Sequence, residues 1–260
     1  GDPRKQKETK LPNRQVPFSD AFVAFIPEEW APYSTELPAR LAAAEHTQPR
    51  RDAVSAAYPG ERLVVPAGGL KVRSNDTDYP FRPHSAFAHL TGLGADREPD
   101  AVLVFEPVFT EGDGDEVEDA GHVATLYFKP RAPRTDPEFY ADARYGEMWV
   151  GQRESLEEMQ AMTGLPCEAI SELPAALSTN TDRIPTRVVR GVDDRITQLL
   201  DELRRTNEVD FDPCTDEEFA VMLSELRLIK DDFELEQMQL AVDATKVGFD
   251  AVITDFPTAV

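Results

Sequence analysis

The stretch Arg73-Ser-Asn-Asp-Thr-Asp-Tyr-Pro-Phe-Arg-Pro-His-Ser-Ala-Phe-Ala-His-Leu-Thr-Gly-Leu93 combines carboxylate, guanidinium, imidazole and aromatic side chains within one short span. Charged side chains are rarely fully buried unless they are paired, so several of these groups must pair together, cap the backbone or face a ligand. Ser85 is a suitable cap for a short helix, and Gly92 is a suitable end. Phe87 and Leu90 share one face of that helix. The stretch therefore predicts an extended polar segment that runs into a short amphipathic helix at an edge or cleft.

The segments on either side alternate between strand and helix patterns. Apolar runs that end at turn residues predict strands at 62–66, 100–105 and 122–128, with short strands at 167–170 and 186–190. Capping boxes at Ser155, Thr215 and Asp231 mark helix starts. Helices are predicted at 35–43, 49–58, 155–164, 171–178, 192–203, 215–226 and 231–256. This alternation indicates an α/β fold, and an antiparallel pair among the strands makes the expected sheet mixed.

Residues 1–34 carry many prolines and little periodic pattern, which predicts an extended arm that lies on the domain. Its expected anchors are Phe22, Phe25, Ile26 and Trp30.

The acidic tract at 111–119 has a faint likeness to a calcium loop, but Val117 stands where an oxygen ligand is wanted. A solvated hairpin loop of like charges is the preferred interpretation.

The composition is that of a globular protein, and its charge limits the partners. A formal net charge of −22 argues against nucleic acid, because phosphates would be repelled. The acidity favours either basic peptide or protein partners or simply a solvated surface. No apolar run reaches the roughly 20 residues that a membrane-spanning helix needs, and residues 1–14 are polar and basic rather than a signal peptide. Cys167 and Cys214 give no disulfide framework and no metal spacing, so no membrane partner and a cytoplasmic location are expected.

The opening stretch resembles the N-terminal domain of aminopeptidase P, the Xaa-Pro aminopeptidase. The family consensus runs roughly Arg-x-Asn-Asp-x-x-Tyr-Pro-[Tyr/Phe]-Arg-x-x-Ser-x-Phe-x-x-[Leu/Phe]-Thr-Gly. The matching residues are Arg73, Asn75, Asp76, Tyr79, Pro80, Phe81, Arg82, Ser85, Phe87, Leu90, Thr91 and Gly92.

This resemblance implies a specific architecture. After the arm at 1–34, residues 35–225 would form an α/β domain with a ribonuclease-H-like mixed sheet. Residues 226–260 would begin the C-terminal catalytic domain, which has the so-called pita-bread fold, with its first long helix.

The resemblance also implies the activity of the complete protein, which is removal of the N-terminal residue from peptides with proline in second position. Two divalent metal ions, usually manganese, activate the attacking water in such an enzyme. Their ligands would lie beyond Val260, in a C-terminal catalytic half that partners this segment, and the segment alone would be inactive. The four histidines fit this view because none of them pairs at a metal-binding spacing. A homo-oligomer, dimer or tetramer, is a further expectation from the family.

The resemblance places candidate substrate-binding residues in two stretches. Trp149 and Arg153 match a Trp-x-Gly-x-Arg pattern whose arginine is implicated at the substrate channel of the family. The alternative for Arg153 is an ion pair inside the domain, for instance with Asp142 or Glu154. The opening stretch adds the candidates Asp76, Tyr79 and Arg82. These three residues would form either a polar rim that faces the cleft or a buried turn whose side chains bond to one another.

One departure from the family pattern concerns the short helix, in which Ala88 and His89 replace two large aromatic residues. A channel wall built from those rings would therefore differ in this chain. Two other interpretations remain open. One is a prolidase- or creatinase-like relative, and the other is a non-catalytic acidic interaction module with an aminopeptidase-like fold.

Overall fold

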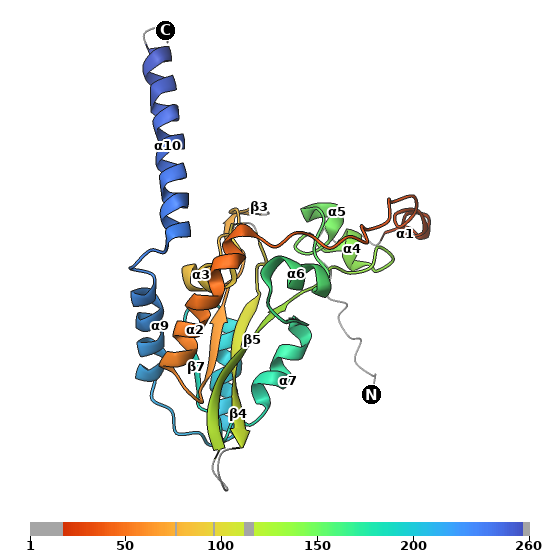
Figure 1. Cartoon of the computed structure of the whole chain (residues 1–260). Helices are drawn as coiled ribbons and strands as arrows, with labels where there is room; N and C mark the ends of the chain where they lie inside the picture. The colour runs from red at the N-terminus through yellow and green to blue at the C-terminus, as the bar shows by residue number, and fades with distance from the viewer. Residues whose placement is uncertain (1–17, 76, 96, 112–116, 257–260) are drawn as a thin grey trace, which may run out of the picture. The chain divides into compact units, whose positions relative to one another are not determined.

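The computed structural model describes residues 18–75, 77–95, 97–111 and 117–256, which divide into two compact units (Figure 1). The first unit combines residues 18–36 with residues 131–153. The second unit combines residues 37–130 with the chain from 154 onward.

The second unit is built on a five-stranded mixed sheet, as the sequence predicts. Its strands, in the spatial order of the sheet, are β6 (Cys167–Ala169), β5 (Val117–Phe128), β4 (Val102–Glu111), β1 (Arg62–Pro66) and β7 (Thr186–Val188). The two central pairings, β5 with β4 and β4 with β1, are antiparallel, whereas both edge strands pair in parallel. β4 and β5 extend further into the acidic tract than predicted, and the tract's centre lies outside the described residues.

One face of the sheet carries the larger core. Leu63 and Phe105 are paired across β1 and β4, and both are at most 1% exposed. Side chains alternate between the faces of a strand, so these residues point to the same layer of helices. That layer consists of α2 (Thr47–Ala57), α3 (Ser85–Thr91), α6 (Leu156–Thr163) and α9 (Cys214–Leu226).

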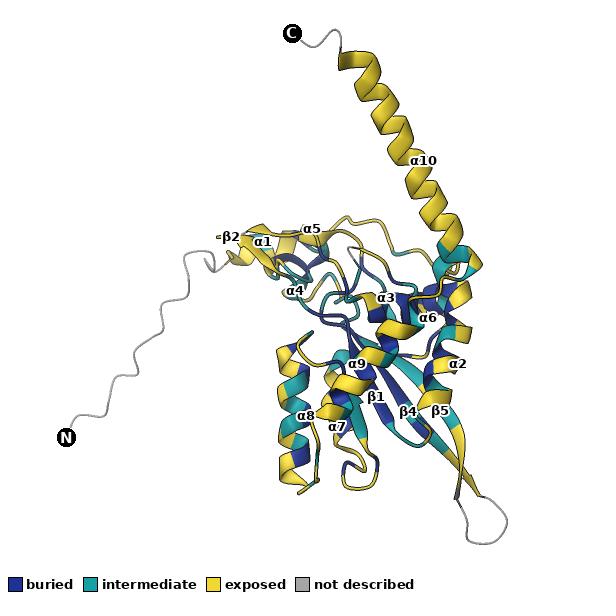
Figure 2. Cartoon of the chain, turned by 90° about the vertical axis from the view of Figure 1, so that its left-hand side faces the viewer, coloured by how far each residue is buried: buried dark blue, intermediate teal, exposed yellow. Residues whose placement is uncertain are grey.

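The opposite face carries the smaller core, which α7 (Leu173–Ser178) and α8 (Asp194–Thr206) cover. Val64 and Val104, the next residues along β1 and β4, belong to this core. Figure 2 shows the central strands buried between the two helical layers. Strands buried on both faces read as continuous apolar runs, which is why the pattern of β1 was visible in the sequence.

Several predicted helix ends are confirmed. Gly92 ends α3 in the left-handed conformation with φ +77°, where glycine lacks the steric penalty of a Cβ. The capping boxes at Ser155 and Asp231 form, and Asp231 opens α10 (Asp232–Asp255). The start of α3 is shifted by one residue, because His84 rather than Ser85 is its cap.

One predicted helix and one predicted helix cap are wrong. No helix forms at 35–41, and the chain instead makes a short 3-10 turn, η1 (Ala42–His46), before α2. Pro38 explains this, because proline lacks an N–H and disfavours a helical residue before it. The predicted capping box at Thr215 does not form either, since α9 begins one residue earlier and the Thr215 hydroxyl donates to the carbonyl of Asp212.

The described part of the first unit contains three short helices rather than a purely extended arm. They are α1 (Asp20–Phe25), α4 (Glu138–Ala141) and α5 (Glu147–Val150). Ile26 is 7% exposed and serves as the predicted anchor, with Phe22 packed beside it. Phe25 and Trp30 remain largely exposed, although the Trp30 ring meets Phe139 edge to face. The described helices include none with the length and apolarity needed to cross a membrane.

Candidate functional site

The polar half of the opening stretch forms a small two-stranded ribbon, β2 (Val72–Ser74) and β3 (Thr77–Asp78). Tyr79 follows the ribbon with 55% of its surface exposed, and Arg82 is exposed as well. The buried-turn alternative is therefore wrong for these two residues. Asp76, the third candidate of this stretch, lies outside the described residues.

The apolar half of the stretch enters the core. Phe81 is 6% exposed, and Phe87 and Leu90 are fully buried among the residues of the larger core. The stretch thus anchors an exposed polar ribbon to the sheet through its second half, which is the arrangement the sequence predicts.

The second group of candidates surrounds α5 in the first unit. Trp149 is 62% exposed, and its indole N–H donates to the carbonyl oxygen of Tyr140 at 2.7 Å. Arg153 is only 7% exposed, and its guanidinium carbon lies 5.0 Å from the ring centroid of Tyr145. The backbone N–H of Arg153 donates to the Glu147 carboxylate at 2.7 Å. An exposed indole therefore lies four residues before a buried guanidinium in the same unit.

A cation–π cluster next to these residues was not predicted. The guanidinium groups of Arg131 and Arg134 lie 3.9 and 4.0 Å from the ring centroid of Tyr33. The Tyr33 hydroxyl donates to Glu147, the same carboxylate that accepts from the Arg153 backbone. Burial, followed by this contact with Glu147, raises the pKa of Tyr33. No local pattern could reveal the cluster, since its members come from segments about a hundred residues apart in the chain.

The two internal partners suggested for Arg153 both have other contacts. Glu154 forms an ion pair with Arg97 at 2.5 Å. Asp142 accepts hydrogen bonds from the backbone N–H groups of Arg144 and Tyr145. A role for Arg153 in contact with substrate stays a prediction.

His89, one of the two residues that depart from the family pattern, belongs to α3 and lies beside the first turn of α10. Its Nε2 is 3.8 Å from the Glu234 carboxylate, and its backbone carbonyl accepts from Arg50 at 3.0 Å. Burial, followed by the charge of Arg50, lowers the pKa of His89 to about 4. Arg50 also binds Asp231, the cap of α10, at 2.5 Å. Arg50 of α2 thus connects the His89 carbonyl of α3 to the cap of α10.

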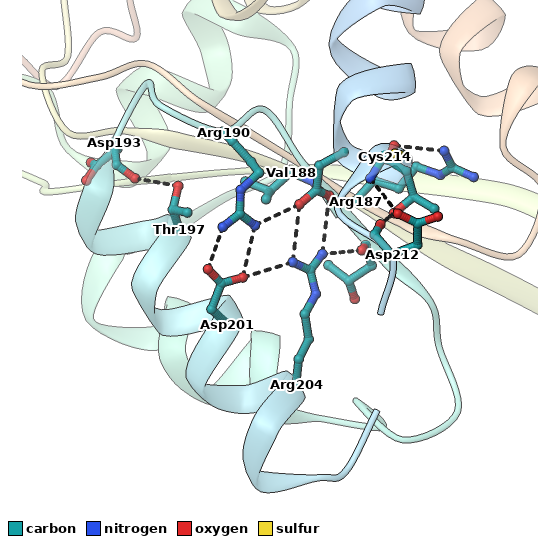
Figure 3. Close-up of polar contacts among 12 residues, drawn as sticks. Arg187, Val188, Arg190, Asp193, Thr197, Asp201, Arg204, Asp212 and Cys214 are labelled. Atoms are coloured by element: carbon teal, nitrogen blue, oxygen red, sulfur yellow. Dashed lines mark hydrogen bonds and ion pairs between the residues drawn. The ribbon is translucent and has the colours of Figure 1, made fainter. Parts of the chain in front are cut away.

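A second unpredicted cluster joins α8, α9 and β7 around Asp216. Its carboxylate, which is fully buried, accepts from the Val188 backbone N–H at 2.9 Å and from Arg190 at 3.0 Å. Arg204 reaches both of its oxygens. Arg190 and Arg204 also bind the half-exposed Asp201, as Figure 3 shows. The contacts satisfy the buried carboxylate from within the chain, which is the pattern of a structural network rather than an open site.

The described residues contain no cluster of three histidine, cysteine, aspartate or glutamate side chains that could hold a metal ion. The described part of the chain therefore does not fit the role of a resident metal centre.

With this geometry in view, the comparisons with known proteins identify the class. The model of the aminopeptidase P N-terminal domain family matches residues 46–188, which include the β2–β3 ribbon, α3 and all five strands of the main sheet. The chain belongs to this family.

The matching relatives are peptidases. The chain is 42% identical over 257 residues to Xaa-Pro aminopeptidase 1 of Streptomyces coelicolor, covering 96% of this chain and 48% of that protein. It is 30% identical over 217 residues to an Xaa-Pro aminopeptidase of Haemophilus influenzae, covering 81% of this chain and 42% of that protein. The chain thus spans about half the length of the curated relatives it matches.

A solved structure supports the fold. Proline aminopeptidase P II from Yersinia pestis superposes with a TM-score of 0.53 at 20% identity, covering 74% of this chain and 41% of that one. The mixed α/β fold predicted from the sequence is therefore that of the aminopeptidase P N-terminal domain.

Proposed function

We propose that this chain is the N-terminal part of a metal-dependent Xaa-Pro aminopeptidase, which removes the first residue from peptides that carry proline in second position. The observation that carries the proposal is the 42% identity to a Streptomyces Xaa-Pro aminopeptidase across nearly the whole chain. The aligned region covers 96% of this chain, so the similarity extends well beyond a short motif.

In this proposal the catalytic metals are bound outside the chain. Two divalent ions, with manganese as the expected metal, would be held by residues beyond Val260. The 260-residue segment alone is accordingly expected to be inactive.

The surface of α10 supports a partnership with a catalytic half. This 24-residue helix has no buried residue, and Figure 2 shows its exposure along nearly its whole length. An isolated helix with an apolar face gains most of its stability from packing against a partner. Its exposed apolar residues at helical spacing include Leu235, Met238, Val242, Phe249 and Val252.

The substrate-binding residues belong to the same proposal. Trp149 in the first unit, and Tyr79 and Arg82 in the second, are exposed and would each contact a peptide or a second subunit, whereas buried Arg153 would act by fixing the loop after α5. A channel wall, a homo-oligomer and a cytoplasmic location are the remaining parts of the proposal.

The test uses the full-length protein. Release of the N-terminal residue from an Xaa-Pro peptide is compared with release from the matched Xaa-Ala peptide, before and after treatment with a chelator and again after added Mn²⁺. The proposal expects proline-dependent activity that the chelator removes and Mn²⁺ restores. A folded full-length protein with neither bound metal nor proline-dependent hydrolysis would refute it and would favour the acidic interaction module.

A matched pair of variants tests the channel role. Trp149→Ala should raise KM for an Xaa-Pro peptide, while Arg183→Gln, whose side chain is 80% exposed on a loop of the second unit, should leave the kinetics unchanged. Equal kinetics for both variants would remove Trp149 from the proposed channel.

A further inference from the structure

A polar cavity of about 150 Å³ lies between α2, β5 and the residues that follow α6. Its lining includes Arg51 and Ser55 from α2, His122 from β5 and Gly164. A water molecule occupies about 30 Å³ in the liquid, so the cavity has room for an ion larger than water. The candidate residues of the proposed peptidase site are not among its lining residues.

Arg51 brings a buried positive charge to this cavity. The residue is 3% exposed, and its guanidinium donates to the Thr47 hydroxyl at 2.6 Å, the Leu90 carbonyl at 2.8 Å and the Gln48 amide oxygen at 2.8 Å. All three acceptors are uncharged, whereas buried charges in proteins are normally paired with an opposite charge. Burial, followed by the nearby charge of Arg40, lowers the pKa of Arg51.

Arg40 supplies a second guanidinium at the edge of the cavity. A Cβ built on Gly164 would lie 1.9 Å from Arg40 Nη2 and 2.5 Å from its Cζ, so the guanidinium rests directly on this glycine. Arg40 is exposed, and among the described residues its side chain has no hydrogen bond and no ion pair. The negative end of the α6 helix dipole, at Gly164, favours a cation and is one reason for the place of Arg40. The helix dipole does not explain why a second arginine, Arg51, lies at the same cavity.

Two further polar groups complete the lining. Ser55 Oγ lies 2.7 Å from His122 Nδ1, and His122 Nε2 lies 2.7 Å from the carbonyl oxygen of Glu61. Because the carbonyl can only accept, Nε2 carries the hydrogen and Nδ1 accepts from the serine hydroxyl in the neutral ring. The hydroxyl is thus held at the cavity wall by a ring of fixed orientation.

One carboxylate among the lining residues would repel a bound anion. Asp52 lines the cavity and accepts a hydrogen bond from the Gln48 amide at 2.7 Å. Two arginines against one aspartate still leave the immediate surroundings positive, in a chain whose formal net charge is −22.

We propose that this cavity is an oxyanion site that binds a tetrahedral ion of the phosphate class between the guanidinium groups of Arg40 and Arg51. Guanidinium groups bind phosphate oxygens through paired N–H donors. The two guanidinium groups and the Ser55 hydroxyl lie at different parts of the cavity. Such an arrangement of donors suits a tetrahedral ion with four oxygens better than a planar carboxylate.

The experiment titrates inorganic phosphate into the full-length protein by calorimetry, with ionic strength held constant by chloride. Arg40→Gln is the test variant because its side chain is exposed and makes no hydrogen bond within the described residues. Arg205→Gln is the matched control, since this arginine is 71% exposed on α8, at the opposite face of the sheet. Removing one charge-assisted interaction should weaken phosphate binding about ten-fold or more, and the control should bind like the unaltered protein.

Three outcomes would overturn the proposal. They are the lack of saturable phosphate binding, an equal loss in both variants, which would indicate general charge screening, and acetate binding as tight as phosphate binding. A purely structural role for Arg40 would lower the melting temperature of Arg40→Gln and leave its phosphate affinity unchanged, which also counts against the site.

Discussion

Truncation of Asp216 tests whether the buried ionic cluster holds β7, α8 and α9 together. Asp216→Ala removes a fully buried carboxylate that accepts from the Val188 backbone N–H and from Arg190 and Arg204. The Arg204 side chain, which is 6% exposed, then retains Asp201, which is half-exposed, as its one counter-ion among the described residues.

The size of the effect follows from these contacts. Removal of one partner from a buried ion pair costs about 3–5 kcal/mol, because the other charge is left buried. The buried Val188 N–H, left without an acceptor, would cost about 1–3 kcal/mol if the loss were additive. Since Arg204 keeps one carboxylate and the Thr186 carbonyl, we expect a total loss of about 3–5 kcal/mol.

The assay is urea unfolding followed by circular dichroism, with stability taken from the midpoint at unchanged slope. Asp201→Ala is the control, because its carboxylate is 42% exposed and surface pairs contribute about 0–1 kcal/mol. Asp216→Asn, which keeps an acceptor for Val188 N–H, should lie between the two and serves if the alanine variant does not fold. Similar midpoints for Asp216→Ala and Asp201→Ala would refute the reasoning.

Three further predictions concern a turn, a histidine and the thiols. Gly92→Ala should destabilise the protein by about 1–3 kcal/mol in the same urea assay, because residue 92 has φ +77° and the new Cβ would lie 2.7 Å from the backbone nitrogen of Ala44. Gly94→Ala is the control, since the space at its Cβ is open, and it should change stability by less than about 0.5 kcal/mol. Equal losses for the two variants would contradict this prediction. Burial lowers the pKa of His89 from its ordinary value of 6.5 to about 4. The unfolded chain therefore binds more protons between these two pH values, so stability should rise with pH across that window and be lost as the pH falls toward 4. His89→Gln should flatten this pH dependence of the urea midpoint, and an unchanged pH dependence would count against it. Burial raises the pKa of the Cys167 thiol to about 12. A thiol reagent should therefore modify the exposed Cys214 in the native protein and Cys167 only after denaturation. Rapid modification of both thiols in the native protein would contradict the burial of Cys167.

The fold could be predicted well where the signal is local. Strand β1 is an apolar run between turn residues, and the capping boxes at Ser155 and Asp231 are complete within four residues. The errors arose where another local feature overrode the pattern used for the prediction. Pro38 prevented the helix predicted at 35–43, and the start of α9 one residue early turned the Thr215 cap into an interior position.

The candidate site was predictable only in part. The motif around Tyr79 and Arg82 identified an exposed polar ribbon, because polar side chains that lack partners in the core remain at the surface. The cluster around Tyr33 brings this residue together with arginines about a hundred residues later in the chain. The proximity of Arg51 and Arg40 at one cavity likewise depends on tertiary packing, because Arg51 lies on α2 and Arg40 lies against Gly164 at the end of α6.

The sequence alone determined the family, the alternation of strands and helices, and the acidity of the chain, because motifs, periodicity and composition are properties of neighbouring residues. Only the tertiary structure decided which charges are buried, which partners they meet and where His89 lies. These properties depend on contacts between residues far apart in the chain, and burial sets both the strength of an ion pair and the cost of leaving it incomplete.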